Sequence, residues 1–396
     1  MEKIEKAMRF LKIDVNGNVN RYLNIEVKGA SFVYTVGRNG AKGFPQKKSI
    51  RFLETFIDRK IKEGYVKISL EAENGNSAYR EIENKAVRNL VESLLAYADK
   101  ALKEVNIDFN AVSDDSVEKA QELIYKLYGA KDVAKFNKIL EQLFVTVPRK
   151  MKVVSDFLAH DKNEFTKIVI REQSLLDNIK SKKANKAGDT SADDDENKKT
   201  ILETMGVEIF EADEKTTKQV YDHLHPEVKK KFSKVFVVRN HKTFGNFKKY
   251  MEENNMDRND IHFYYHGSLN QNQWGLITQG PHIVPPKGAK ITGKMFGFGT
   301  YWANNAQKSA NYTSLSGSYW AHGNEHTAFL QVYKVAYKKP LVLDHYENRC
   351  SSFTKNTIGD HDAVFAKAAN GFLFHDEIIT YDDRAATIAY LIELES

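Results

Sequence analysis

The sequence predicts a multidomain α+β protein that consists of a small β-rich domain, an all-α helical bundle and a split β-sheet domain. Three patterns support this prediction. Short alternating apolar runs precede residue 84, apolar residues at helical spacing fill residues 85–180, and strand-like runs return after residue 201. A chain of 396 residues is long enough for about two to four domains.

Residues 1–84 are predicted to form the β-rich domain. Residues 22–27 and 32–36 have the composition of short strands, and Gly29 lies at the turn between them. A glycine-rich basic turn follows at residues 36–43. Helical spacing then extends from residue 50 to residue 61 and ends near Gly64.

Residues 85–180 are predicted to be helical. Apolar side chains fall on one face at residues 87–98, 120–128 and 136–147. Ser113 or Asp114 is expected to cap the second helix, and Pro148 ends the third. Residues 181–200 mix charges and contain no apolar residue larger than alanine, so this stretch is predicted to be a linker or an exposed loop.

Residues 201–396 contain the segments whose residues could bind a ligand or catalyse a reaction. Strands are predicted at residues 235–239, 262–265, 329–337, 341–343, 378–381 and 389–394. Within the run GKMFGFGTYWANNAQKSANY at residues 293–312, Tyr301 and Tyr312 bracket Ser309. Two such rings can hold a flat aromatic ligand while the hydroxyl binds its edge, although core packing is the alternative for any isolated tyrosine pair.

Two further segments complete a recognisable set: His266 in YYHGS at residues 264–268, and Glu377 in DEIITYD at residues 376–382. Together the three segments resemble the catalytic domain of the poly(ADP-ribose) polymerases, whose signature is a His, a Tyr and a Glu on three separate strands. The resemblance implies that residues 201–396 are an ADP-ribosyltransferase domain with NAD+ as substrate. It also implies that His266, Tyr301 and Glu377 are the catalytic residues.

The resemblance also implies roles for the residues around NAD+. Because NAD+ carries a positively charged leaving group, the protein needs only to orient it and stabilise charge on the ribose, which is the task expected of Glu377. The backbone of Gly267 and the hydroxyl of Ser309 would bind the nicotinamide amide, and Ser268 and Asn272 would lie toward the adenosine. The implied NAD+ contacts are His266, Gly267, Ser268, Asn272, Tyr301, Ser309 and Tyr312.

The N-terminal domain resembles the WGR domain, a DNA-contacting module of the DNA-dependent polymerases. The matching pieces are residues 20–22, 37–38, 40, 43 and 64–65. The resemblance implies contacts with DNA breaks or ends, and the cationic candidates are Arg38, Lys42, Lys47 and Lys48. Val36 replaces the tryptophan that packs against the DNA in that family. A solvated basic face on a structural domain is the alternative.

Residues 85–180 resemble the family's helical regulatory domain, best at residues 136–148. The resemblance implies that the helices restrict access of NAD+ and loosen when DNA binds, although a structural spacer is the alternative. His282, Phe298 and His375 depart from the family pattern. Because Glu377 is retained, we expect polymer synthesis on proteins, the enzyme included. A mono-ADP-ribosyltransferase, a DNA-end-binding scaffold with weak catalysis and a transferase with nucleic-acid acceptors are the alternatives.

Composition limits the remaining possibilities. With 41% hydrophobic and 28% charged residues, the chain has an ordinary globular composition, and its net charge of +6 permits nucleic-acid binding without requiring it. Cys350 is the only cysteine, which excludes an internal disulfide and cysteine zinc fingers. We expect no membrane span and no signal peptide. The single cysteine fits a reducing compartment, so we expect an intracellular protein, nuclear in a eukaryote and cytoplasmic or nucleoid-associated in a bacterium. We also expect a monomer.

Two motifs are interpreted as coincidental. Residues 322–326 spell H-x-x-E-H, a zinc-protease pattern, but Gly323 and Asn324 break the helix that such a motif needs, so no metal is expected. Gly297 and Gly299 begin a G-x-G pattern, but Trp302 occupies the position of the third glycine, so a Rossmann site is not supported.

Overall fold

A computed structural model describes residues 4, 6–14, 17–39, 41–68, 79–105, 107, 112–151, 153–187, 198–281, 295–297, 299–369 and 372–396. The chain divides into two compact units. The first unit comprises Met1–Gly75 and Ala101–Ile179, and the second comprises Asn76–Lys100 and Lys180–Ser396. The domain boundaries expected from the sequence remain predictions.

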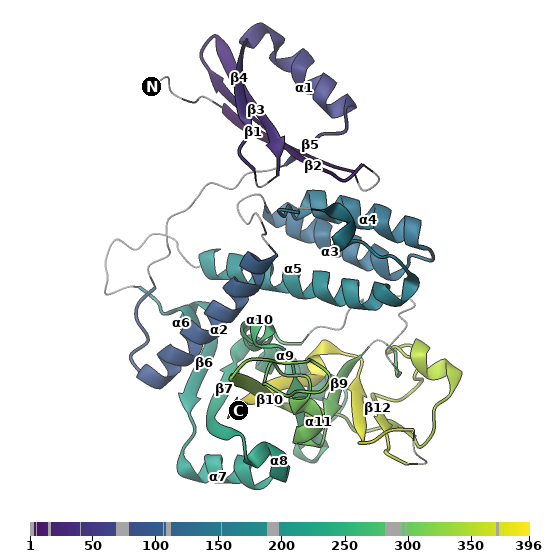
Figure 1. Cartoon of the computed structure of the whole chain (residues 1–396). Coiled ribbons are helices and arrows are strands. Elements are labelled where there is room, and N and C mark those ends of the chain that lie inside the picture. Colours follow the sequence, from purple (N-terminus) through teal and green to yellow (C-terminus); the bar gives the residue numbers. More distant parts are fainter. Residues whose placement is uncertain are drawn as a thin grey trace. The chain divides into compact units, whose positions relative to one another are not determined.

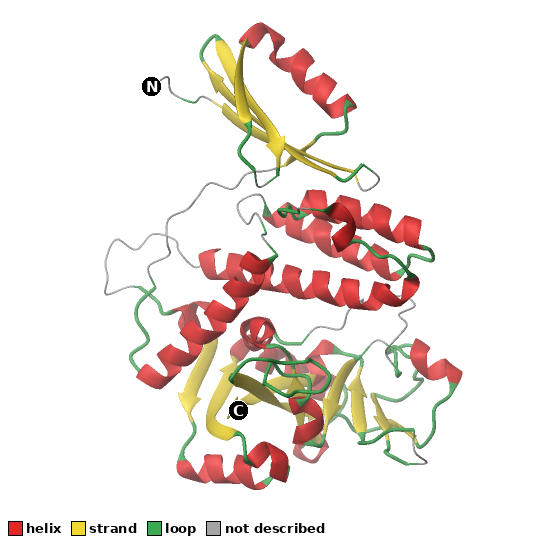
Figure 2. Cartoon of the chain, in the orientation of Figure 1, coloured by secondary structure: helices red, strands yellow, loops and turns green. Residues whose placement is uncertain are grey.

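An antiparallel sheet dominates the start of the first unit, and the described part of it contains five strands in the order β4-β3-β2-β1-β5. One helix, α1, lies on one face of this sheet (Figure 1, Figure 2), where Phe56 packs with Phe10 and Leu23. The predicted strands, the turn at Gly29 and the helix are confirmed. The elements are β1 (Lys6–Asp14), β2 (Val19–Lys28), β3 (Ser31–Arg38), β4 (Phe44–Ser49), η1 (Ile50–Phe52), α1 (Leu53–Lys62) and β5 (Val66–Ile68).

The remainder of the first unit is helical. Its core joins the buried faces of α3 and α4 to α5, and Phe136 stacks on Phe165 with ring centroids 3.9 Å apart. The hydroxyl of Ser113 accepts a hydrogen bond from the backbone of Ser116 and caps α3, as predicted. The helical elements from residue 85 to residue 187, of which α2 and α5 each extend into the second unit, are α2 (Lys85–Glu104), α3 (Asp114–Tyr128), α4 (Val133–Thr146), η3 (Val154–Phe157), η4 (Lys162–Glu164) and α5 (Phe165–Ala187).

Two helices differ from the predicted bundle. Residues 85–100 of α2 belong to the second unit, where Leu90 and Leu94 join a core that includes Trp274. A separate helical bundle is therefore not confirmed. Helix α5 continues to Ala187, seven residues into the predicted linker, with Ser181 buried and the Lys182 ammonium 2.8 Å from the Asp99 carboxylate.

A mixed sheet forms the centre of the second unit. Over the described residues it contains nine strands in the order β11-β12-β13-β9-β8-β10-β14-β7-β6, and only the β11–β12 pair is parallel. All six predicted strands are present. They and their neighbours are β6 (Val207–Glu211), β7 (Phe232–Asn240), β8 (Ile261–Gly267), β9 (Thr300–Ala303), β10 (Thr327–Ala336), β11 (Pro340–Leu343), β12 (Ala363–Ala366), β13 (Glu377–Thr380) and β14 (Ala386–Glu395).

Short helices connect these strands. The α-helices are α6 (Ile201–Met205), α7 (Glu214–Asp222), α8 (Pro226–Lys229), α9 (His241–Glu253), α10 (Asn270–Gln279) and α11 (Ala306–Ala310); the 3-10 turns are η6 (Arg258–Asp260), η7 (Asn348–Ser352) and η8 (Asp383–Ala385). None of the helices within the described ranges is long and apolar enough to cross a membrane.

Candidate active site

Three neighbouring strands bring the predicted catalytic residues together. His266 lies near the end of β8, Tyr301 lies on β9, and Glu377 is the first residue of β13. Because β9 pairs with both β8 and β13, Ala303 is the cross-strand partner of Tyr265 on one side and of Glu377 on the other. Residues more than a hundred positions apart in the sequence therefore meet at one end of three adjacent strands.

A pocket of about 320 Å³ opens at this end of the strands. Six of the predicted site residues line it, together with Lys308, two hydrophobic side chains and one alanine. The lining residues are His266, Gly267, Met295, Tyr301, Trp302, Ala303, Lys308, Ser309, Tyr312 and Glu377. The volume and the mixture of aromatic and polar groups are typical of a small-molecule site.

The imidazole of His266 is held in one tautomer. Its Nδ1 lies 3.1 Å from the carbonyl oxygen of Tyr301, and because a carbonyl only accepts, Nδ1 carries the proton and Nε2 carries the lone pair in the neutral ring. The rings of Trp302 and Tyr333 lie 5.6 and 6.2 Å from the imidazole. The ring of His266 is therefore oriented by β9 and by the aromatic core beneath it.

The phenol of Tyr301 is held at both its donor and its acceptor side. Its hydroxyl donates to the carbonyl of Gly297 at 3.0 Å and accepts from the backbone N–H of Phe296 at 3.1 Å. The hydroxyl of Tyr381 donates to the carbonyl of Phe296 at 2.6 Å, so a second tyrosine holds the backbone that contacts the Tyr301 hydroxyl. Burial raises the pKa of Tyr301, so the phenol stays neutral and serves as a ring wall.

Helix α11 forms the opposite wall. Asn305 caps this helix through its side chain, and Ser309 and Tyr312 reach the pocket from its end. A Cβ atom at Gly267 would lie 1.8 Å from the carbonyl oxygen of Ser309, so only glycine lets β8 approach α11 this closely. Burial, and secondarily the charge of Glu377, raises the pKa of Tyr312.

Lys308 was not assigned a role from the sequence, although it belongs to the KSANY motif. Its ammonium forms an ion pair with the Glu377 carboxylate, and both side chains are 16% exposed. The helical position of Lys308 next to Ser309 could have indicated that it faces the pocket. Its partner, however, lies 69 positions away in the sequence, and no local pattern links the two residues.

The geometry agrees with what comparison with known proteins finds. Residues 208–396 match the poly(ADP-ribose) polymerase catalytic domain. The poly(ADP-ribose) polymerase-like protein 100L of Invertebrate iridescent virus 6 is 26% identical over 172 residues, which are 42% of this chain and 88% of that protein. These matches support the poly(ADP-ribose) polymerase family for this part of the chain, and with it ADP-ribosyltransferase activity and NAD+ as substrate.

Cellular poly(ADP-ribose) polymerases match over shorter segments. Human poly(ADP-ribose) polymerase 2 is 45% identical over 62 residues, which are 15% of this chain and 10% of that protein. Zebrafish (Danio rerio) poly(ADP-ribose) polymerase 1 is 48% identical over 52 residues, which are 13% of this chain and 5% of that protein. The aligned part is thus a small fraction of both cellular enzymes.

Other predicted contacts of the poly(ADP-ribose) polymerase domain lie outside the pocket lining. The Asn272 amide donates to the Ser268 hydroxyl at 3.0 Å, and neither residue lines the pocket. The Nδ1 atom of His375 lies 3.4 Å from the Asn305 amide nitrogen. His282 and Phe298 are outside the described residues.

The predicted DNA-binding cations differ in their exposure to solvent. Arg38, Lys42 and Lys47 are exposed, whereas the Lys48 ammonium lies over the Tyr34 and Phe56 rings at 5.7 and 5.3 Å. Lys47 and Lys48 are adjacent on β4, so their side chains leave opposite faces of the sheet. Lys48 is therefore engaged with the aromatic face of the domain.

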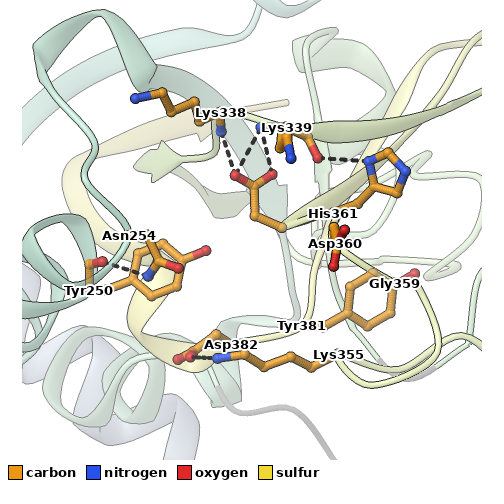
Figure 3. A pocket seen from close by; sticks show the side chains of 11 residues that line it. Tyr250, Asn254, Lys338, Lys339, Lys355, Gly359, Asp360, His361, Tyr381 and Asp382 are labelled. Atoms are coloured by element: carbon orange, nitrogen blue, oxygen red, sulfur yellow. Dashed lines mark hydrogen bonds and ion pairs between the residues drawn. The ribbon is translucent and has the colours of Figure 1, made fainter.

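Figure 3 shows a second pocket, of about 310 Å³, which contains none of the predicted site residues. It lies beyond the other end of β13, where the Lys355 ammonium is 2.7 Å from the Asp382 carboxylate. Tyr381 lines this pocket, and its hydroxyl donates a hydrogen bond to the carbonyl of Phe296 beside the catalytic pocket.

In the described part of the chain no group of three His, Cys, Asp or Glu side chains could hold a metal ion. Residues 322–326, which spell the H-x-x-E-H pattern, form a loop.

Proposed function

We propose that the protein is a DNA-stimulated poly(ADP-ribosyl)transferase that consumes NAD+ and modifies proteins, itself included. The observation that carries the proposal is the convergence of His266, Tyr301, Ser309, Tyr312 and Glu377 on one pocket of about 320 Å³. The pocket supplies ring walls, hydroxyl and backbone groups for an amide, and one carboxylate beside them. These are the groups that cleavage of a nicotinamide from a ribose requires.

The residues divide the work of binding and chemistry. The rings of Tyr301 and Tyr312 would enclose the nicotinamide, while Gly267 and Ser309 bind its amide. The lone pair on His266 Nε2 would accept a hydrogen bond from a ribose hydroxyl. The Glu377 carboxylate would face the positive charge that develops on the ribose as nicotinamide leaves with the bonding electrons. The acceptor oxygen then bonds to the same carbon and releases its proton.

Lys308 would position the catalytic carboxylate. A side chain at the first residue of a strand can adopt several rotamers, and a carboxylate displaced by about 1 Å can lower a reaction rate about a hundredfold. The ammonium of Lys308 on α11 contacts the Glu377 carboxylate and would limit it to one direction. Helix α11 would therefore bind the nicotinamide amide through Ser309 and orient the carboxylate through Lys308.

Two features of the first unit support DNA stimulation. Phe44, the cross-strand partner of Val36, is 82% exposed on β4, and its ring could take the place of the tryptophan that Val36 replaces. The side-chain amides of Asn20 and Asn39 both donate to the Arg149 carbonyl, at 3.3 and 3.1 Å, which joins the sheet to the segment after α4. Binding at the sheet could thus alter the helices.

One assay tests the proposal against its alternatives. Purified protein is incubated with labelled NAD+, with and without nicked or blunt DNA, and the products are resolved on a gel. A DNA-dependent smear supports the polymerase, a single sharp shift supports mono-transfer, and no incorporation supports the scaffold. Incorporation into the nucleic acid would indicate a nucleic-acid acceptor.

Variants assign the roles in the same assay. Glu377→Gln keeps the shape of the side chain but removes its charge, so the smear should become a sharp band or disappear. Unchanged polymer length would remove Glu377 from its role.

Two measurements test DNA stimulation. Arg38→Ala should weaken DNA stimulation with basal activity intact. Amide hydrogen exchange in α3, α4 and α5 should accelerate when DNA is added, and unchanged exchange would contradict helical control.

A further inference from the structure

Three exposed aromatic rings gather where α11 ends. The Tyr312 and Trp320 rings are nearly parallel, with centroids 6.3 Å apart and planes 20° apart, and the Tyr319 ring meets Trp320 edge-on at 4.6 Å. Tyr312, Tyr319 and Trp320 are 44%, 64% and 55% exposed. Single exposed aromatic residues are ordinary, but a contiguous group of three indicates a binding surface.

The loop that carries Tyr319 and Trp320 is held in place by its own hydrogen bonds. The backbone N–H groups of Trp320 and Ala321 both donate to the Asn311 carbonyl at 3.0 Å. The Ser318 hydroxyl accepts from the Gly323 backbone at 2.8 Å, and a Cβ at Gly323 would lie 2.4 Å from the Leu315 carbonyl. The two rings are thus presented to solvent by an ordered backbone, which lowers the entropy lost on binding.

The aromatic group continues the catalytic pocket outward. Tyr312 belongs to both, because it lines the pocket and stacks beside Trp320. The charge of Glu377 contributes to the raised pKa of Tyr312, so the shared ring lies within electrostatic reach of the carboxylate. A ligand on Trp320 would therefore sit at the mouth of the pocket, beside the reacting groups.

We propose that Tyr319 and Trp320 stack the adenine ring of an ADP-ribose unit. The proposal rests on the proposed function, in which substrate and product both carry adenine. Stacking recognises the face of a base and needs no charge. A surface that follows a nucleic-acid backbone needs cations, but residues 313–326 contain no Lys or Arg, and Glu325 is paired with Lys100 at 3.0 Å. The surface therefore fits a single base better than a strand.

Tryptophan fluorescence gives a direct test that requires no catalysis. The chain has three tryptophans, and Trp274 and Trp302 are buried, so Trp320 is the exposed reporter. ADP-ribose and AMP should quench the wild-type emission, whereas ribose 5-phosphate should not. The Trp320→Phe variant supplies the correction for any quenching of the buried pair. Equal quenching by ribose 5-phosphate would overturn the proposal.

Calorimetry with ADP-ribose then assigns the contact. Trp320→Ala should weaken binding about tenfold, as expected for one stacked base, and Trp320→Phe should restore most of the affinity. Tyr346→Ala removes another exposed ring, on the segment after β11, and should leave affinity unchanged. Wild-type affinity in Trp320→Ala, or an equal loss in Tyr346→Ala, would contradict the proposal. So would competition by an oligothymidylate as effective as that by ADP-ribose, because the surface would then bind bases generally.

Kinetic measurements distinguish whether the stacked adenine belongs to the donor NAD+ or to the growing ADP-ribose chain. If the adenine belongs to the donor, Trp320→Ala should raise KM for NAD+. If it belongs to the growing chain, products should shorten at saturating NAD+ while KM stays constant. Failure of the proposed function is separate, because wild-type protein would then release no nicotinamide from NAD+ and the binding measurements would still report the stacking contact.

Discussion

The ammonium of Lys308 on α11 contacts the carboxylate of Glu377 at the start of β13. The two side chains come from elements that have no backbone hydrogen bonds to each other, and both are largely shielded from solvent. The contact therefore fixes the carboxylate from a second element. It also couples the position of helix α11, which carries Ser309, to the position of strand β13, which carries Glu377.

Lys308→Met should impair chemistry more than binding. The variant keeps the aliphatic stem but frees the carboxylate to rotate, so kcat should fall about a hundredfold while KM for NAD+ changes little. Initial rates of nicotinamide release at several NAD+ concentrations measure both constants. Lys308→Arg should recover part of the loss. If Lys308→Met raises KM and leaves kcat unchanged, the lysine binds substrate rather than orienting the carboxylate.

Gly267→Ala should displace α11 from β8. The added methyl group would lie 1.8 Å from the Ser309 carbonyl, so the strand or the helix must move. We expect a loss of roughly 1–3 kcal/mol in the free energy of unfolding and a large loss of nicotinamide affinity. Gly245→Ala is the matched control because a Cβ there meets nothing within 4 Å, and this change in helix α9 should stabilise by up to about 1 kcal/mol.

Arg149 and Glu172 form a buried ion pair in the first unit, and Glu172→Gln should destabilise that unit strongly. Both side chains are 1% exposed, with a nitrogen–oxygen distance of 2.8 Å. Removing the negative charge leaves the guanidinium without compensation, which costs roughly 3–5 kcal/mol. Urea unfolding followed by hydrogen exchange in α4 and α5 should show the change. Glu63→Gln, the same substitution in exposed pairs with Arg59 and Lys60, should change stability by less than about 1 kcal/mol. Comparable losses in both variants would argue against a special role for burial.

Phe44→Ala should reduce stimulation by DNA ends. The ring is 82% exposed on β4 opposite Val36, and stacking on one nucleotide contributes roughly 1–3 kcal/mol. The DNA concentration for half-maximal stimulation should rise about tenfold, while activity without DNA stays constant. Phe52→Ala removes another exposed ring, from η1, and serves as the comparison. An identical response of both variants would exclude a specific contact at Phe44.

Asp382 should make stability depend on pH in the acid range. Burial alone would raise its pKa, but hydrogen bonds from Arg384 and Lys355 outweigh burial and lower the pKa from 3.8 to about 2. The contact with Lys355 is drawn in Figure 3. The ionised carboxylate therefore stabilises the fold above about pH 4, and this contribution is lost as the pH falls through about 2.

Arg384→Gln tests this dependence. It should lower the free energy of unfolding by about 1–2 kcal/mol between pH 5 and pH 7, and the difference from wild type should shrink toward pH 2. Urea unfolding at several pH values measures it. Arg349→Gln, in the exposed pair with Glu347, is the control and should show little pH-dependent difference. A constant difference at every pH would mean that Arg384 acts through packing on Tyr250 instead.

The sequence predicted individual strands and helices better than it predicted which of them lie next to each other. The residue types at residues 262–265 were enough to predict that strand, because β-propensity is a local property. Tyr301 was expected on a strand only from the resemblance to the poly(ADP-ribose) polymerases. The ion pair of Lys308 with Glu377 could not be predicted in this way. It depends on the strand order, which brings α11 and β13 together, and strand order is a property of the whole chain.

The limits of the helices were also decided by tertiary contacts. The apolar stripe on α2 indicated a buried face, but it did not indicate that Leu90 and Leu94 join the core of the second unit. The polar composition after residue 180 indicated a linker, yet α5 continues because Ser181 is buried and Lys182 pairs with Asp99. Packing overrode local propensity at both places.

The contribution of α2 to the core around Trp274 affects how this enzyme can be divided. A fragment that begins at residue 201 carries the whole catalytic pocket, but it lacks Val87, Leu90, Val91 and Leu94 from its own interior. Such a fragment exposes the apolar surface that these side chains cover. A stable minimal catalytic protein therefore has to include residues 76–100, supplied either in the same chain or as a separate peptide that completes the fold.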